Sequence, residues 1–368
     1  MKRMEPSRVS RVRYCLKCLT LAFGVVLFCV LLSGCLLQSK KTLPDNQQVQ
    51  PISKQGFQLD TLVTLTIYDK KDETLLQEAE QEIHRLEQLL SVSIPGSDPE
   101  RLARYAGLDF VEVGEETAFL LPLCSTLSAW SDGAFDCTVG PLVALWNIKD
   151  TGGYYPSTAE REEALSFVDY RDVHIRQDGQ VMLAREGMRI DFGAIAKGYI
   201  ADQVKALLVE KGVRSGLVDL GGNILLIGEK PGGEAFRVGA RDPEAGPSDY
   251  FGVFTLRDKS LVSSGPYQRF FVHENTAYHH IMDTSTGFPV DNTLLQVTIV
   301  SDSSALGDGL STTAYALGLE KGLSLIRGMD GVDAVFVTKE KTVYVTEGIQ
   351  DAFTIVSEAY TMAAVEDL

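Results

Sequence analysis

The sequence predicts a single α+β domain in which mostly antiparallel sheets pack against helices. Many short stretches rich in Val, Ile, Leu and Thr follow one another across tight turns such as Gln177-Asp178-Gly179-Gln180. Only a few amphipathic helices interrupt these stretches. Because no regular strand–helix–strand alternation runs along the chain, a doubly wound parallel sheet is not expected.

The first 35 residues have the composition of a lipoprotein leader. Residues 1–18 carry six basic residues against one acid, and residues 19–32 are almost wholly apolar. Roughly fifteen apolar residues are too few for a membrane span but suit a signal-peptide core. The ending Leu32-Ser33-Gly34-Cys35 resembles the lipobox of bacterial lipoproteins. We therefore predict a signal peptide at 1–34 and a lipidated Cys35 on the extracytoplasmic face of the cell membrane. An ordinary signal peptide or an uncleaved anchor is the alternative.

Residues 36–55 are polar and lack periodicity, which predicts a flexible tether and places the folded domain at 56–368. Loss of the leader's six bases and one acid would take the formal charge from −16 to −21. Such an acidic surface repels nucleic acid, so no nucleic-acid partner is expected. Cys124 and Cys137 are expected to be buried free thiols, with a disulfide as the alternative, and their spacing offers no zinc site.

Periodicity predicts the main elements in order. Gly56–Tyr68 alternates as a strand does, and Asp72 then caps an amphipathic helix. The apolar stripe of that helix is Leu75, Leu76, Ala79, Ile83, Leu86 and Leu90. Further helices are expected at 115–131, 195–211 and 303–319. Further strands are expected at 172–175, 180–184, within 213–228, and at 236–240, 252–257, 261–264, 268–273, 277–282 and 294–300.

The segment Asp191–Tyr199 (DFGAIAKGY) places small residues where an apolar strand runs into a helix. Such a junction presents free backbone N–H groups at the positive end of a helix, and small residues let a ligand approach them. Lys197 adds a cation to an otherwise acidic protein. The alternative is a plain helix start capped by Asp191, with Lys197 in solvent.

The segment Gly307–Thr312 (GDGLST) places Asp308 and Thr312 four residues apart on a predicted helix, so that both side chains lie on one face. Carboxylate and hydroxyl oxygens suit Mg²⁺, which keeps its other positions for water and phosphate oxygens. The alternative is a local hydrogen bond between these two side chains.

The segment Tyr278–Pro289 (YHHIMDTSTGFP) contains two adjacent histidines. Because neighbouring strand residues point to opposite faces, only one of His279 and His280 can face a given site. A histidine there could deprotonate an alcohol near neutral pH. The alternative is a histidine at a strand end that hydrogen bonds to a loop.

Other segments are less specific. Gly133–Leu142 (GAFDCTVGPL) is neither helix nor regular strand. An apolar, aromatic loop with one acid can hold a ring system, and a simple connector is the alternative. Asp219–Asn223 (DLGGN) and Ser263–Phe270 (SSGPYQRF) are interpreted as turns, and nothing local assigns a role to Tyr267 or Arg269.

The order and content of these segments together resemble the ApbE-type FAD:protein FMN transferases, from about residue 56 to about residue 350. The resemblance implies an α+β domain of the family's own type, with FAD as substrate and Mg²⁺ as cofactor. It implies transfer of the FMN half of FAD to a Thr or Ser hydroxyl of another protein, with release of AMP. The acceptor would be extracytoplasmic, often a subunit of a membrane electron-transport complex.

The same resemblance maps residues onto family roles. The backbone oxygen of Ala194 and the side chains of Asp308 and Thr312 would hold Mg²⁺, and His280 would act in acid–base chemistry. FAD contacts would come from Ala134, Phe135, Asp136, Asp191, Lys197, Ile281 and Met282. Gly309 stands where the family usually has Ala, which weakens that helix by about 1 kcal/mol.

Three other functions are alternatives at this stage. The same fold could act as a Mg²⁺-dependent FAD pyrophosphatase that gives FMN and AMP. A non-catalytic flavin-binding lipoprotein would need no base, so Asp308, Thr312 and His280 together count against it. A solute-binding lipoprotein would show a two-lobed α/β pattern, which the sequence lacks.

Overall fold

The computed structural model describes residues 50–148, 152–246 and 248–365, which belong to one compact unit. The predictions for the signal peptide and for Cys35 lie outside the described residues. The helices are α2 (Glu73–Leu90), α3 (Asp98–Arg104), α4 (Glu115–Trp130), α5 (Gly140–Trp146), α6 (Thr158–Leu165), α7 (Ala196–Glu210), α8 (Ser304–Leu317) and α9 (Leu319–Arg327), with 3-10 turns at Tyr170–Asp172 and Glu347–Ala352. The strands are β1 (Ile52–Gln58), β2 (Thr61–Ile67), β3 (Val111–Glu112), β4 (Val173–Ile175), β5 (Gln180–Leu183), β6 (Ser215–Leu220), β7 (Asn223–Gly228), β8 (Phe236–Arg241), β9 (Tyr250–Leu256), β10 (Ser260–Ser264), β11 (Phe270–His273), β12 (Thr276–His279), β13 (Leu294–Ser301), β14 (Asp333–Thr338), β15 (Thr342–Val345), β16 (Phe353–Ile355) and β17 (Thr361–Ala363).

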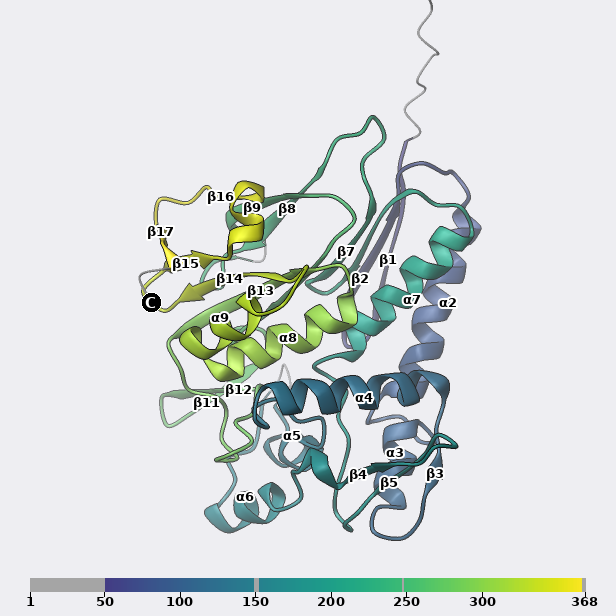
Figure 1. Cartoon of the computed structure of the whole chain (residues 1–368), viewed down its shortest axis with the longest axis vertical. Coiled ribbons are helices and arrows are strands. Elements are labelled where there is room, and N and C mark those ends of the chain that lie inside the picture. Colours follow the sequence, from purple (N-terminus) through teal and green to yellow (C-terminus); the bar gives the residue numbers. More distant parts are fainter. Residues whose placement is uncertain (1–49, 149–151, 247, 366–368) are drawn as a thin grey trace, which may run out of the picture. The chain divides into compact units, whose positions relative to one another are not determined.

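A nine-stranded sheet in the order β1-β2-β6-β7-β10-β13-β14-β15-β17 forms the centre of the molecule. Its neighbouring strands pair antiparallel, except that β15 and β17 are parallel. Helices α2, α7, α8 and α9 pack against this sheet, and α7 lies between α2 and α8 (Figure 1). Apolar side chains from these helices and from the sheet form the main core, which includes Ile83, Val204 and Leu310. The predicted α+β class with mostly antiparallel strands is therefore confirmed.

A second core lies between the large sheet and a three-stranded sheet of order β16-β9-β8. It joins Leu226 and Val335 of the large sheet to Phe236, Phe254 and Phe353 of the smaller one. The large sheet is thus covered on one side by helices and on the other by strands. Because both of its faces are buried, its central strands are almost continuously apolar, as β13 shows.

A smaller group of elements, α3 to α6 and β3 to β5, lies below the helices in Figure 1. The hairpin β11–β12 packs on Trp146 at the end of α5, where the indole and the ring of Tyr278 stack with centroids 5.5 Å apart. The indole Nε1–H donates to the Gly287 carbonyl at 2.8 Å. This contact holds the loop after β12 against α5, and that loop carries the histidine segment described below.

The structure corrects the expected start of the fold. Strand β1 begins at Ile52, inside the segment predicted to be tether, and the single strand expected at Gly56–Tyr68 is a hairpin. Its turn is Leu59-Asp60, and both residues have a φ of 55°. β1 is an edge strand whose alternate residues face solvent, so its polar composition hides it from a search for apolar runs.

Several other predictions can be compared with the structure residue by residue. All six residues of the apolar stripe of α2 are buried, and the Asp72 carboxylate accepts from the Thr74 N–H at its N-terminus. The last three residues of the segment Gly133–Leu142, for which a connector was the alternative, begin helix α5 (Gly140–Trp146). Cys124 and Cys137 are buried and free, as expected. Among the described residues, no helix has the length and apolar content to cross a membrane.

Candidate active site

The N-terminus of α7 is built by a tight turn rather than by a side-chain cap. The Asp191 carboxylate accepts from the Gly193 N–H at 2.6 Å, while the Asp191 N–H donates to the Cys137 carbonyl at 2.7 Å. Ile195, at the N-cap, makes no side-chain capping bond. The plain helix start capped by Asp191 is therefore not what forms, and Asp191 instead joins the turn to the segment around Cys137.

Asp308 of α8 takes over part of the capping of α7. Its Oδ2 accepts from the Gly198 N–H at 2.8 Å. In a regular helix that N–H would bond to the carbonyl four residues earlier, which belongs to Ala194. Within the described residues no backbone N–H donates to Ala194, so its carbonyl oxygen is available to a ligand.

The Asp308 side chain is almost completely buried, with 4% of its surface exposed. Burial raises its pKa above the ordinary range, although nearby Lys197 and the Gly198 N–H act in the opposite direction. A buried carboxylate in this position would be stabilised by a cation at its remaining lone pairs.

Thr312 lies one turn further along α8 and is partly exposed. Its hydroxyl lies 3.2 Å from the Ser264 hydroxyl at the end of β10, and Ser264 also lies 2.7 Å from the Ser311 hydroxyl. No hydrogen bond joins the side chains of Thr312 and Asp308 in the described part of the chain, so the expected alternative of a local pair is not observed. β10 thereby holds this turn of α8 in place.

The oxygen atoms of Ala194, Asp308 and Thr312 fit a magnesium ion in kind and number. All three are hard ligands, and only one carries a charge, so the ion would keep positions for water and phosphate oxygens. The described residues contain no cluster of three or more His, Cys, Asp or Glu side chains that could hold a metal. A cation held by these three oxygens would complete its coordination with water and with phosphate oxygens of a bound substrate.

The two histidines have different surroundings, as the alternation of strand residues predicts. His279 is buried, its Nε2 lies 2.8 Å from the Val290 carbonyl, and its Nδ1 accepts from the Ile281 N–H at 3.2 Å. Both of its ring nitrogens are thus used, which is the structural role proposed as the alternative for this segment. His279 has no nitrogen left for a substrate.

His280 keeps one ring nitrogen available. Its Nδ1 lies 3.2 Å from the Arg269 carbonyl, and because a carbonyl only accepts, Nδ1 carries the proton of the neutral ring. The lone pair is then on Nε2, for which the described residues provide no hydrogen-bond partner. Burial lowers the pKa of His280 to about 4, helped by the charges of Lys197 and Arg269. The ring is therefore neutral at pH 7 and able to accept a proton.

Two cations lie close to these groups. The Lys197 ammonium donates to the Gly193 carbonyl at 3.3 Å. Its charge acts to lower the pKa values of Asp191, Asp308 and His280, against burial in the two carboxyls and with burial in the histidine. Arg269 acts on Asp191 and His280 in the same way, and its Nη2 donates to the Asp60 carbonyl at 3.3 Å. Positive charge is thus concentrated here in a protein whose formal net charge is −16.

The loop that contains Ala134, Phe135 and Asp136 is held by its own side chains. Asp136 accepts from the N–H and hydroxyl of Thr138, both at 2.7 Å, and from the Tyr170 N–H at 2.8 Å. Phe135 is buried and Ala134 is partly exposed. The Asp136 carboxylate therefore shapes the loop, and the partly exposed Ala134 is the residue best able to meet a ligand there.

The strand expected at 277–282 is shorter than predicted. β12 ends at His279, and Ile281 and Met282 follow in a loop where both side chains are buried. The Ile281 carbonyl accepts from the Val290 N–H at 2.9 Å, and Met282 forms an isolated bridge with Pro289. This loop is joined to the Ala134 loop by a hydrogen bond of 2.6 Å from the Thr284 hydroxyl to the Gly133 carbonyl.

Sequence reasoning missed the residues that join α7, α8 and β7. A Cβ at Gly198 would lie 2.1 Å from the Ser304 carbonyl oxygen, so glycine is required there. Asn223, interpreted only as part of a turn, is buried and accepts from the Ser304 hydroxyl at 2.8 Å. Its amide nitrogen has no hydrogen bond of normal geometry but lies near enough to Asp308 to lower the pKa of that carboxyl.

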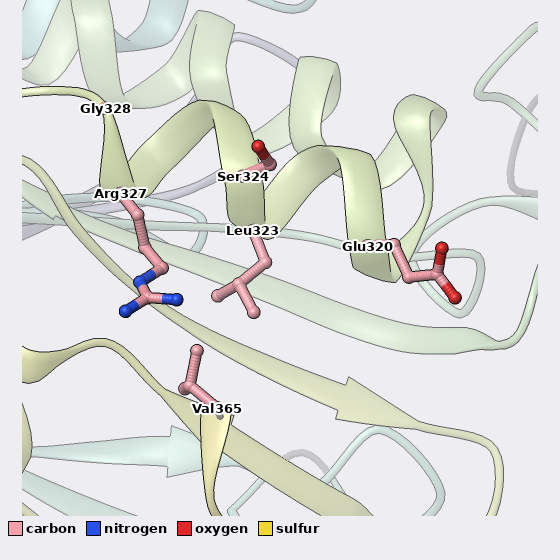
Figure 2. A pocket seen from close by; sticks show the side chains of 6 residues that line it. All are labelled: Glu320, Leu323, Ser324, Arg327, Gly328 and Val365. Carbon is pink, nitrogen blue, oxygen red and sulfur yellow. The ribbon is translucent and has the colours of Figure 1, made fainter. Parts of the chain in front are cut away.

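A cavity of about 560 Å³ lies elsewhere, between α9 and the C-terminal segment. Glu320, Leu323, Ser324, Arg327, Gly328 and Val365 line it (Figure 2). None of the residues singled out from the sequence contributes to it. The Arg327 guanidinium is already paired with Glu347 at 2.5 Å, so this cavity presents no unpaired cation from that residue.

The sequence of this chain is similar to those of known proteins along most of its length. The model of the ApbE family matches residues 59–336. An FAD:protein FMN transferase of Treponema pallidum is 34% identical over 346 residues, covering 89% of this chain and 96% of that protein. One from Klebsiella pneumoniae is 34% identical over 299 residues, covering 81% and 92%.

Solved structures show the same fold. The ApbE protein of Thermotoga maritima superposes with a TM-score of 0.76 at 29% identity, covering 82% of this chain and 99% of its own. The apo form of the flavinyl transferase ApbE of Pseudomonas stutzeri superposes with a TM-score of 0.74 at 30% identity, covering 85% and 100%.

Proposed function

The chain belongs to the ApbE family, and from that premise we propose that it is an enzyme that transfers FMN from FAD to a protein. The acceptor group is a Thr or Ser hydroxyl, AMP is released, and Mg²⁺ is required. The relatives that carry the name FAD:protein FMN transferase support the transfer itself. The requirement for Mg²⁺, the hydroxyl acceptor and the release of AMP are proposed from the resemblance to the ApbE family.

The observation that carries the proposal is the contact between α7 and α8. The Gly198 N–H bonds to Asp308 rather than to Ala194, which frees the Ala194 carbonyl beside a buried carboxylate. Such a pair has little purpose in a protein that only stores a flavin, because a buried carboxylate is costly without a cation. A site that handles a pyrophosphate with a divalent ion accounts for both features.

We propose His280 as the general base. Its Nδ1–H is directed to the Arg269 carbonyl, so Nε2 can take the proton from the acceptor hydroxyl. The hydroxyl oxygen then bonds to the FMN phosphorus as the bond from that phosphorus to the bridging oxygen breaks. AMP leaves with the bridging oxygen, so charge and atoms balance. Such a transfer depends on positioning and on charge neutralisation more than on covalent help from the protein.

The anionic substrate needs positive charge close to it, because the protein as a whole has a formal net charge of −16. Lys197 and Arg269 supply two cations near His280. When bound between Ala194, Asp308 and Thr312, Mg²⁺ would neutralise phosphate oxygens and favour departure of AMP. The partly exposed Ala134, Asp191 and the segment at Ile281 and Met282 would lie beside FAD.

We also propose that the enzyme acts on the extracytoplasmic face of the cell membrane, anchored by lipid at Cys35. The support for this is the basic, apolar and lipobox-like order of residues 1–35. An acceptor in a membrane electron-transport complex would then be within reach of the anchored domain.

One assay tests the function directly. The protein is incubated with FAD, Mg²⁺ and a candidate acceptor, and the products are followed by in-gel flavin fluorescence and by release of AMP. We expect a fluorescent acceptor band with one AMP for each transfer. AMP with free FMN and an unlabelled acceptor would instead identify a pyrophosphatase. Bound FAD without AMP would identify a flavin-binding protein.

A further inference from the structure

Helices α7 and α8 approach each other closely at two points. At the first, a Cβ on Gly198 would lie 2.1 Å from the Ser304 carbonyl oxygen and 2.7 Å from the Asp308 Cβ. The first of these atoms belongs to the backbone and cannot move aside easily. The absence of a side chain at residue 198 is therefore what allows Asp308 to reach the N-terminus of α7.

At the second point, Asp202 of α7 binds the first turn of α8. Its Oδ1 accepts from the Ser304 N–H at 2.8 Å, and its Oδ2 accepts from the Ala305 N–H at 2.9 Å and the Ser303 hydroxyl at 3.0 Å. These N–H groups have no partner within their own helix. A carboxylate from another helix thus satisfies them and also favours the positive end of the α8 dipole.

The two contacts lie one helical turn apart, along α7 and along α8 alike. Gly198 and Asp202 are separated by four residues, and so are Asp308 and Ser304, in the opposite order along the chain. Each helix therefore contributes a carboxylate to the other's N-terminal region. Two such contacts determine the distance between the helices and, together with the bonds from Ser264 to α8, the rotation of α8 about its axis.

From this arrangement we infer that Asp202 is a positioning residue for the metal: it holds Asp308 of α8 in register with the Ala194 carbonyl that precedes α7. The inference rests on the metal site of the proposed function. Asp202 itself does not touch the ion. It acts through the α8 backbone, in the way that residues behind metal ligands orient them, and loss of such partners commonly weakens metal affinity 10–100-fold.

A simple helix cap would have a different signature. Removing an N-cap lowers thermal stability but leaves ligand geometry unchanged once the protein is folded. A positioning residue also changes the affinity for the metal, and that affinity can be measured without substrate. The full-length chain, purified in detergent, can therefore be titrated with Mn²⁺ as a spectroscopic substitute for Mg²⁺, with free Mn²⁺ measured by electron paramagnetic resonance.

The test variant is Asp202→Asn, which retains the shape of the side chain and one accepting oxygen. The matched control is Asp72→Asn, since Asp72 caps α2 through the Thr74 N–H and hydroxyl but lies on no element of the metal site. We expect a dissociation constant for Mn²⁺ about 10-fold or more above wild type in Asp202→Asn, and a wild-type constant in Asp72→Asn. The Mg²⁺ concentration for half-maximal transfer should rise in parallel, while kcat at saturating Mg²⁺ should stay within about twofold.

Wild-type Mn²⁺ affinity in a folded Asp202→Asn protein, with only a lower melting temperature, would overturn the inference and leave Asp202 as a cap. If Asp202→Asn does not fold, Ser303→Ala decides the question through its Mn²⁺ affinity. It removes the hydroxyl that donates to Asp202 and that caps α8 by accepting from the Leu306 N–H, and it leaves the carboxylate in place. Ser303→Ala should raise the dissociation constant for Mn²⁺ about threefold. A wild-type constant in this variant would contradict the inference. If wild type binds Mn²⁺ but forms neither labelled acceptor nor AMP, the proposed function fails while the Mn²⁺ comparison still decides the role of Asp202. If wild type binds no Mn²⁺, both proposals fail.

Discussion

Asp308→Asn should raise the stability of the metal-free protein and weaken its binding of Mg²⁺. The amide still accepts a hydrogen bond from the Gly198 N–H, which lies 2.8 Å from Oδ2 in wild type, so the contact between α7 and α8 survives. Only the charge is removed. Because burial raises the pKa of Asp308, the carboxylate lowers the stability of the metal-free protein. This loss grows as pH rises from the ordinary carboxyl pKa to the raised one and is constant above it. The variant without metal should therefore melt at a higher temperature than wild type at pH 7.

The effect on metal binding follows from the size of the lost charge interaction. A carboxylate and a doubly charged ion about 4 Å apart at an effective dielectric constant of about 20 interact by roughly 8 kcal/mol. The burial cost of the carboxylate is already part of the folded protein, so binding does not incur it again, while dehydration of the ion offsets part of the gain. A net loss of about 2.8 kcal/mol corresponds to roughly 100-fold weaker binding of Mg²⁺.

The assay compares melting temperatures with and without Mg²⁺, alongside the rate of FMN transfer as Mg²⁺ is varied. Wild type should gain stability from Mg²⁺ by mass action, and Asp308→Asn should not at the same concentration. Transfer by the variant should require much higher Mg²⁺. If the variant showed the wild-type increase in melting temperature and normal transfer at low Mg²⁺, Asp308 would not be a metal ligand and the reasoning would be refuted.

Three other predictions concern single features of the structure. His280→Ala should lower the transfer rate by about 100-fold or more while the affinity for FAD is unchanged. Because the His280 pKa of about 4 keeps the ring neutral, protonation of this residue should not lower kcat/KM of the wild type between pH 5.5 and 7.5. A fall in wild-type kcat/KM below about pH 6.5 that is absent from His280→Ala would contradict this. Gly198→Ala should destabilise the protein by about 1–3 kcal/mol and weaken Mg²⁺ binding, because its Cβ would meet the Ser304 carbonyl oxygen at 2.1 Å; denaturant unfolding and the Mg²⁺ titration measure both, and unchanged values would argue against the close helix contact. Cys124 and Cys137 should react with a maleimide only after unfolding, because both are buried thiols, and a native mass about 2 Da lower, indicating a disulfide, would disprove the free state.

Local pattern was sufficient for features that lie within one element. The apolar stripe of α2 and its cap at Asp72 follow from spacing along one helix, and both are confirmed. The alternation of strand residues correctly separated His279, whose ring nitrogens are both used, from His280. Local pattern is less reliable for the bounds of strands. It does not reveal the start of β1, because half of the residues of this strand face solvent. It extends β12 past His279, because Ile281 and Met282 are apolar like strand residues.

Gly309 shows why a local rule can mislead. From helix propensity it is a weakness in α8, since glycine costs about 1 kcal/mol relative to alanine. The structure shows that a Cβ at this position would lie 2.3 Å from the Leu127 Cδ1 of α4. An alanine at residue 309 would therefore require the Leu127 side chain to move, so a contact between helices far apart in the sequence offsets part of the gain in helix propensity.

From its sequence alone this protein could be assigned to an α+β fold of one family, with Asp308, Thr312 and His280 as candidate site residues, because those inferences use spacing along single elements or the order of motifs. Only the tertiary structure decided that Ala194 has a free carbonyl, that Gly198 and Asp202 join α7 to α8, and that the Asp136 carboxylate serves its own loop. The physical reason is that a hydrogen bond between residues 198 and 308 spans 110 positions, and no periodicity encodes which distant backbone group will meet a given carboxylate.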